Sequence, residues 1–311
     1  MRPLRPVDTA ALVMFAKYAG ASQAFTLERA ISGSPPFFSV IRHLGSAFAP
    51  RSKKRVWVSG TPARIDAVLR AGPRSGPLVW ELREFYETRL SESAEVELLE
   101  LIGAEAAAAG ALRILLRTEA ESGLIPPARR AGFLPHRTET LYRLEGEKAP
   151  GEGSIEAMAT QMGLRHRQST DDNGLFRLYC AVTPVEVRTH SGMTAGEWSD
   201  GQEAPAHGEE EWVWEDDGQI KAWLGISHTP GERYIAVAAD QSFPQGVPSL
   251  VECAVAGVGA GGAVALVPDY ETAVSAALNM KGFEPQREFQ VLARPLTVRV
   301  KHPSGVVAAA G

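Results

Sequence analysis

The stretch that decides the fold is Ala128–Phe133, ARRAGF, because a similar step, NMKGF at Asn279–Phe283, recurs in the second half of the chain. The glycine of the second stretch lies 150 residues after the glycine of the first (282 − 132). In both places a helical pattern precedes the glycine, which is typical of a helix C-terminus. Strand-like segments follow at Glu139–Leu144 (ETLYRL) and Glu288–Leu292 (EFQVL). The recurrence indicates two units of the same kind.

The segments that lead up to each Gly-Phe step follow the same order. Periodicity and turn residues predict first-half helices at 8–18, 26–31, 93–109 and 126–131 and strands at 55–59, 64–70, 77–87 and 112–117. They predict second-half helices at 171–182, 247–258 and 270–281, helix starts at 183–186 and 194–197, and strands at 211–214, 219–226, 233–239, 263–267 and 289–300. A hairpin turn is expected at 216–218, and the first Gly-Phe turn is expected to open a last hairpin that ends in 139–144. This repeated order predicts two α/β (α+β) domains.

The chain length and one polar stretch define the domain boundaries. The 311 residues suit two domains of roughly 150 residues each. Residues 145–154, EGEKAPGEGS, contain one proline and three glycines and have no hydrophobic period, which is typical of a linker. We predict an N-terminal domain at 1–144, a linker at 145–156, a C-terminal domain at 157–303 and a flexible tail at 304–311.

Composition excludes several classes of function. The 37 acidic and 32 basic residues give a net charge of −5, which provides no electrostatic reason to bind nucleic acid. No apolar run approaches the roughly 18 residues that span a membrane. Cys180 and Cys253 have neither metal-site spacing nor a disulfide framework, and the seven histidines form no metal-ligand pattern. We therefore expect a cytoplasmic protein without a metal, bound to neither nucleic acid nor membrane.

The element order, with a basic residue shortly before each Gly-Phe pair, resembles the GNAT superfamily of acyl-CoA-dependent N-acyltransferases. The resemblance covers nearly the whole chain, once in each half. It implies two tandem GNAT-like domains, each a mostly antiparallel, twisted mixed sheet flanked by helices. It also implies a ligand cleft at the central split between two strands, and it leaves room for the two sheets to join across a pseudo-twofold relation. A monomer and a homodimer both stay open.

The resemblance implies acetyl-CoA as cofactor, with its pyrophosphate on a glycine-rich loop at a helix N-terminus. In the first half this loop falls at 88–95, which has no glycine and carries Glu92 and Glu95, whose charges compete with an anion. In the second half it falls at 240–248, which keeps Gly246 but contains two prolines without backbone donors. The second half is therefore the better candidate for the active half. Its candidate cofactor-binding residues are Gln245, Gly246 and Ser249.

The catalytic residues implied by the resemblance are only partly present. Many members of the superfamily have a tyrosine four residues before the Gly-Phe glycine, which protonates the leaving CoA thiolate; those positions are Ala128 and Leu278 here. Tyr270, at the start of the second of these helices, is the candidate replacement. A general base must take a proton from the attacking amine. The candidates are Glu81, on a first-half strand, and Asp240, at the end of a second-half strand.

Two further features of the second half bear on a ligand. Four tryptophans, Trp198, Trp212, Trp214 and Trp223, are expected to pack in the core, with an aromatic groove as the alternative. Acidic residues near them favour an amine or cation over a phosphate. The polar stretch 192–208 fits either a lid on the substrate side or a surface loop.

Three functions stay open at this point. The first is an acyl-CoA-dependent N-acetyltransferase that acts on a small-molecule amine with non-standard cofactor contacts. The second is a catalytically inactive GNAT-like binding or scaffold protein, because both halves depart from the phosphate-loop pattern. The third, a purely structural pairing module, has no positive signal in the sequence.

Overall fold

The computed structural model describes residues 2–33, 55–88, 90–146, 155–203, 209–229, 232–256 and 262–296. The first half contains β1 (Arg2–Pro3), the 3-10 turn η1 (Pro6–Asp8), α1 (Thr9–Ala16), α2 (Leu27–Ser32), β2 (Arg55–Thr61), β3 (Arg64–Pro73), β4 (Val79–Glu87), α4 (Glu92–Ala108), β5 (Arg113–Glu119), α5 (Ile125–Arg130) and β6 (Leu134–Leu144). The second half contains α6 (Ile155–Gln161), β7 (Arg165–His166), the 3-10 turn η4 (Ser169–Asp171), α7 (Asp172–Val182), α8 (Val185–Ser191), α9 (Ala195–Gly201), β8 (Glu209–Asp216), β9 (Gln219–Thr229), β10 (Glu232–Ala239), α10 (Gly246–Ala256), β11 (Ala263–Pro268), α11 (Thr272–Met280) and β12 (Glu284–Pro295). Most of the predicted linker, 147–154, and the predicted tail, 304–311, lie outside the described residues.

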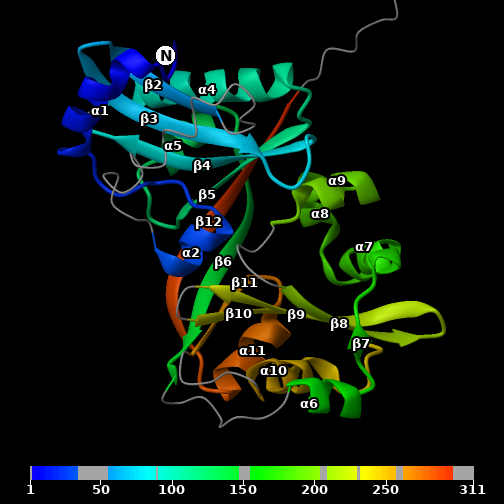
Figure 1. The fold of residues 1–311 in the computed structure, drawn as a ribbon. Coiled ribbons are helices and arrows are strands. Elements are labelled where there is room, and N and C mark those ends of the chain that lie inside the picture. Colours follow the sequence, from blue (N-terminus) through cyan, green and yellow to red (C-terminus); the bar gives the residue numbers. More distant parts are fainter. Residues whose placement is uncertain are drawn as a thin grey trace, which may run out of the picture.

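The twelve strands of the described chain form one continuous sheet in the order β1-β2-β3-β4-β5-β12-β6-β11-β10-β9-β8-β7 (Figure 1). On the two sides of the central β12-β6 pair, corresponding strands of the two halves occupy equivalent positions in the sheet. Neighbouring strands are antiparallel, except that β4 is parallel to β5 and β10 is parallel to β11. The expected mixed, mostly antiparallel α/β architecture is therefore confirmed, and the two sheets join into one.

The last strand of each half lies in the sheet of the other half. β12 pairs with β5 of the first half, and β6 pairs with β11 of the second half. The expectation of a hairpin ending in Glu139–Leu144 was wrong, because β6 runs without a break from Leu134 to Leu144 and pairs with β12 instead of a neighbour in sequence. The sequence pattern specifies that β6 is a strand, but its partner β12 lies about 150 residues away in the sequence.

The local signals that framed the repeat have the expected conformations. Gly132 and Gly282 adopt left-handed φ angles of +84° and +86° just after α5 and α11, a conformation that glycine adopts without strain. The phenylalanines that follow, Phe133 and Phe283, are buried in the cores of their halves. Asp217 also has a positive φ, at the turn between β8 and β9, as the hairpin signal predicted.

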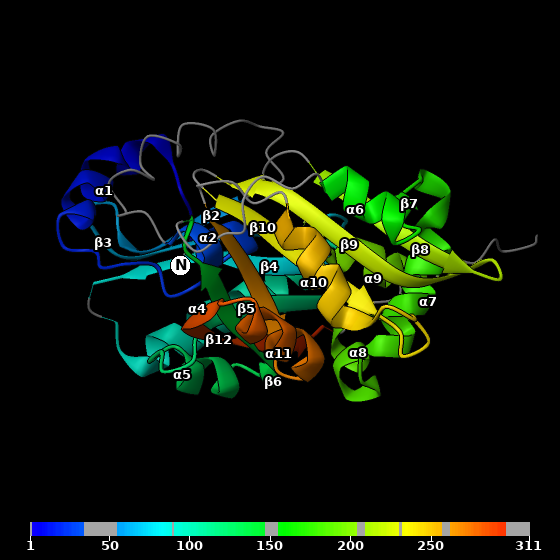
Figure 2. The same cartoon turned by 90° about the horizontal axis from the view of Figure 1, so that it is seen from below.

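Helices cover both faces of the sheet, because side chains alternate along each strand. On β3, Leu69 packs toward the core formed with α4 and α5, while its neighbour Val68 packs with α1 on the opposite face. In the second half, Leu224 lies in the core formed with α10 and α11, and Val213 packs with α7. Figure 2 shows α10 and α11 crossing the second-half strands on one face, and they contact each other.

Candidate functional site

Among the described residues, each half contains one pair of parallel strands that diverge, and the resemblance to GNAT proteins implies a ligand cleft at this split. In the first half, β4 and β5 pair over Val79–Leu82 and Arg113–Leu116 and then separate. In the second half the pairing is shorter, since only Arg233 and Tyr234 of β10 pair with β11. Beyond these pairs, β10 continues over 235–239 and β4 continues over 83–87 without pairing to the parallel strand.

The first-half split is filled by the chain itself. The segment between α1 and α2 crosses it, and the backbone N–H of Gln23 donates to the Phe85 carbonyl on β4 at 2.9 Å. Two residues later, the N–H of Phe25 donates to the Arg117 carbonyl on β5, also at 2.9 Å. The Ser22 hydroxyl accepts from the Phe85 N–H at 3.1 Å. These bonds satisfy the strand edges that a ligand would need.

The second-half split opens into a cavity of about 570 Å³, in the range of small-molecule sites. Its wall includes Val251 of α10 and Val274 and Leu278 of α11 on one face of the sheet. From the other face, α7 and α9 contribute side chains that include Tyr179 and Trp198. The cavity is therefore lined from both faces of the sheet and passes through the split between β10 and β11.

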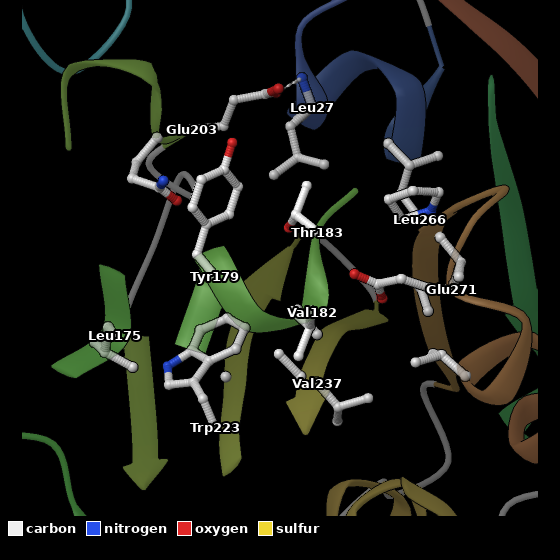
Figure 3. Close-up of a pocket in the computed structure, with 18 of the residues that line it drawn as sticks. Leu27, Leu175, Tyr179, Val182, Thr183, Glu203, Trp223, Val237, Leu266 and Glu271 are labelled. Atoms are coloured by element: carbon white, nitrogen blue, oxygen red, sulfur yellow. Dashed lines mark hydrogen bonds between the residues drawn. The ribbon is translucent and has the colours of Figure 1, made fainter. Parts of the chain in front are cut away.

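The four tryptophans divide between the core and the cavity. Trp212 is buried and Trp214 packs against the same core, as expected. Trp198 and Trp223 line the cavity, so the aromatic-groove interpretation applies to these two. Figure 3 shows Trp223 and Tyr179 on one side of the cavity and Glu271 on the other.

A buried ionic network forms the part of the cavity wall that faces the first half. Arg117, only 2% exposed, donates from Nε to Glu139 at 2.7 Å and from Nη2 to Glu203 at 2.7 Å. Arg74 pairs with Glu203 at 2.8 Å, and Arg137 pairs with Glu139 at 2.6 Å. Arg117 and Arg137 hold the pKa of Glu139 down to about 2, against the opposing effect of burial. Arg117, Arg137 and Glu139 lie on the first-half strands β5 and β6, and Glu203, which follows α9, joins them from the second half.

The polar stretch 192–203 belongs to the cavity wall rather than to a free loop, and 204–208 lie outside the described residues. Three acidic side chains at intervals of three residues attach it to the first half. Glu197 pairs with Arg113 at 2.5 Å. Asp200 accepts from the Leu78 N–H at 2.8 Å, and Glu203 accepts from the Leu27 N–H at 2.9 Å (Figure 3).

Glu271, which precedes α11, is an acid of the cavity wall whose pKa is raised, unlike those of its neighbours Glu139 and Glu203. Burial raises its pKa to about 7, with Glu139 adding to the rise and Arg137 opposing it. Among the described residues, no hydrogen bond or ion pair reaches its carboxylate. Sequence reasoning missed this residue because an acid at a helix start is typical of a favourable dipole contact. A carboxyl with a pKa near neutrality is suited to accept and return a proton.

The structure places the predicted catalytic residues in three different settings. Tyr270 lines the cavity, and burial raises its pKa to about 12. Asp240 lies outside the cavity lining, where its carboxylate accepts from the N–H and the hydroxyl of Ser242 at 2.9 and 2.6 Å. Glu81 also lies outside the lining and pairs with Arg74 and Arg83 at 3.0 and 3.1 Å. Tyr270 alone of the three therefore faces the cavity.

The predicted cofactor residues cluster at the start of α10, outside the cavity lining. Gly246 has a left-handed φ of +69°, and its N–H donates to the Phe243 carbonyl. The Ser249 hydroxyl donates to the Gln245 carbonyl at 2.9 Å, so this hydroxyl's proton is already used. The corresponding turn of the first half is acidic, and burial together with Glu87 raises the pKa of Glu95 to about 7.

No helix in the described ranges is both long and apolar enough to cross a bilayer. No cluster of three or more histidine, cysteine or acidic side chains suited to a metal ion occurs among the residues that the structure describes.

The geometry defines a class of protein: two interlocked α/β halves whose shared sheet has one filled split and one open split. No family model matches the sequence, and no curated protein matches it either. A GCN5-related N-acetyltransferase from Sphaerobacter thermophilus aligns over 96% of this chain and 96% of its own, with a TM-score of 0.54 and 14% identity.

Two further solved structures align over most of the chain. A candidate acetyltransferase from Pyrococcus horikoshii covers 96% of this chain and 90% of its own, with a TM-score of 0.51 and 10% identity. A tandem GNAT protein from the clavulanic acid biosynthesis pathway covers 94% and 97%, with a TM-score of 0.47 and 14% identity. The first two similarities and the strand order give the chain the GNAT fold, present once in each half.

Proposed function

We propose that the protein is an acyl-CoA-dependent N-acyltransferase whose single active site lies in the second half. The observation that carries this proposal is the cavity that passes through the β10-β11 split and has the unpaired carboxyl of Glu271 in its wall. The GNAT fold supports the reaction type, since its members place acyl-CoA in this split. The filled first-half split leaves one such opening among the described residues.

The second-half split fits the acyl-pantetheine part of such a substrate better than the phosphate part. Beyond Tyr234, one edge of β10 has no partner strand, so its backbone groups can bond an extended chain that carries amides. Val237 and Val267 provide apolar walls for that chain. Near the start of α10, Gly246 and Ser249 remain the candidates for the phosphate end.

The residues of the wall can carry the proton transfers of the reaction. Acyl-CoA supplies an acyl thioester, whose carbonyl carbon is the electrophile. The ionised carboxylate of Glu271 can take the proton from the acceptor's ammonium group, which frees the nitrogen lone pair to form the new C–N bond. Tyr270, whose hydroxyl stays protonated at neutral pH, can donate a proton to the thiolate as the C–S bond breaks.

A thiol-release assay with Val237→Trp tests the proposal. Val237 lines the split and is 7% exposed, so an indole at this position fills the opening. We expect amine-dependent release of thiol from acetyl-CoA by the wild type and about a hundredfold slower release by the variant, because the substrate is displaced from the attacking group. The variant's melting temperature shows whether it is folded. Equal rates in a folded Val237→Trp protein would contradict the proposal.

The second candidate is a catalytically inactive protein that binds a small molecule in the same cavity. The loop before α10 favours it: Pro244 and Pro248 supply no backbone donor, and the Asp240 carboxylate lies in the loop itself. An anion would meet few donors and one negative charge there. Ligand binding without thiol release from any acyl-CoA would support this candidate instead.

A further inference from the structure

The charged side chains of the cavity wall are paired with one another, which limits the ligands that the cavity can accept. Of the residues that the structure describes, four arginines and no lysine line it. Each guanidinium has a carboxylate partner, in the pairs Arg74–Glu203, Arg117–Glu139, Arg137–Glu139 and Arg167–Glu211. Arg167 also pairs with Asp172 at 2.6 Å. Each guanidinium charge in the described wall is therefore already matched by a carboxylate, although the buried Nε of Arg167 has no hydrogen-bond partner among the described residues.

The acids of the wall outnumber these arginines by one, and the extra acid is Glu271. Glu211 accepts from the Trp223 indole at 2.9 Å in addition to Arg167, and Asp172, Glu139 and Glu203 are all in ion pairs. The Glu271 carboxylate points into the cavity beside Thr183 (Figure 3). When it is ionised, it is the uncompensated negative charge of the wall, and a cationic group on the ligand can neutralise it.

Opposite Glu271, the cavity is apolar and aromatic. Leu175, Leu178 and Val182 come from α7, Trp198 comes from α9 and Trp223 comes from β9. Leucine, valine and indole side chains favour a ligand body that buries apolar surface. The cavity thus has the Glu271 carboxyl on one side and, facing it, apolar and aromatic side chains together with the ion-paired Arg167, Glu211 and Asp172.

We propose that the acceptor substrate is a primary amine on an apolar, aromatic-sized body that carries no carboxylate or phosphate group. This inference rests on the proposed function and names its acceptor. The ammonium group lies against Glu271, and the ring or alkyl body packs between the α7 leucines and Trp223. An amino acid of the same shape is disfavoured, because its carboxylate would have to compete for an arginine with the acids of the wall.

Binding of three matched ligands in the absence of acyl-CoA tests the inference. The probes are 2-phenylethylamine, L-phenylalanine and 2-phenylethanol, which share a ring and differ in the charged groups. Titrations at about pH 8, where Glu271 is mostly ionised, follow the intrinsic tryptophan fluorescence, to which Trp198 and Trp223 of the cavity wall contribute. We expect the amine to bind about tenfold more tightly than either the amino acid or the alcohol, because only the amine forms an unopposed charge-assisted hydrogen bond.

Two variants test where the ammonium group and the apolar body of the ligand bind. In Glu271→Gln the advantage of the amine over the alcohol should disappear, while the alcohol binds as in the wild type. In Val182→Trp all three ligands should bind more weakly, with the melting temperature as the check on folding. Phenylalanine binding as tightly as the amine, no binding of the amine, or an unchanged preference in Glu271→Gln would overturn the inference. Selective amine binding without thiol release would instead contradict only the proposed transfer reaction.

Discussion

Replacing Glu271 with glutamine is expected to lower kcat/KM for acyl transfer by about a hundredfold or more, which is the usual contribution of a general base. The same change should stabilise the folded protein at alkaline pH. Burial raises the pKa of Glu271 from 4.5 to about 7, so the folded state holds this proton more tightly than the unfolded chain does. Ionising the carboxyl therefore costs stability as the pH rises through this window, and the full cost, about 3 kcal/mol, is present above pH 7.

Glutamine removes that cost, so urea unfolding of Glu271→Gln should show a gain over the wild type at about pH 8.5 that vanishes near about pH 4.5. Glu121 provides the matched control, because it occupies the corresponding position of the first half, 150 residues earlier (271 − 150), and is exposed. Glu121→Gln should change neither rate nor stability. A Glu271→Gln variant that is as active as the wild type, or less stable at alkaline pH, would contradict the role assigned to this carboxyl.

Replacing Arg117 with methionine is expected to destabilise the protein by about 3 kcal/mol or more, because the carboxylates of Glu139 and Glu203 would each lose a buried partner. The stability of the Arg117→Met variant should also change less than that of the wild type as the pH is lowered. The pKa of Glu139 is lowered to about 2, so its pairing stabilises the fold above about pH 4.5 and is lost as the pH falls toward 2. Part of that loss is already present at neutral pH in the variant.

Arg64 is the control for this experiment, since it also forms an ion pair on a strand, with Asp66 at 2.9 Å, but is 72% exposed. Arg64→Met should cost no more than about 1 kcal/mol, as is usual for solvent-exposed pairs. Urea unfolding of both variants, followed by circular dichroism, makes the comparison. If the two substitutions had equal effects, the network would not hold the cavity wall as described.

Much of the fold could be predicted because its signals are local. The glycines before Phe133 and Phe283 end helices, the 216–218 turn connects adjacent strands, and the repeated order of elements pointed to two similar units. Each of these features depends on residues close in sequence. The strand exchange could not be predicted, because the alternation along β6 and β12 specifies which face of each strand is buried and leaves the neighbouring strand undetermined.

The candidate site was predicted only in part, for a related reason. The second half was favoured on its remaining glycine, and Tyr270 does line the cavity. The peptide that fills the first-half split, Ser22–Phe25, has the composition of a loop, and nothing in its pattern shows that its N–H groups meet two separated strands. Arg117 gave a signal that could have been used, because it is a charge that directly follows the apolar run 114–116 of β5. Glu271 gave none, since its pKa depends on burial by distant residues.

Calorimetric titration of the full chain with acetyl-CoA tests the central claim most directly, because it counts sites. An open second-half split and a filled first-half split predict one site per chain, with binding lost in Val237→Trp. Two sites per chain, or one site that survives Val237→Trp in a folded protein, would contradict the account.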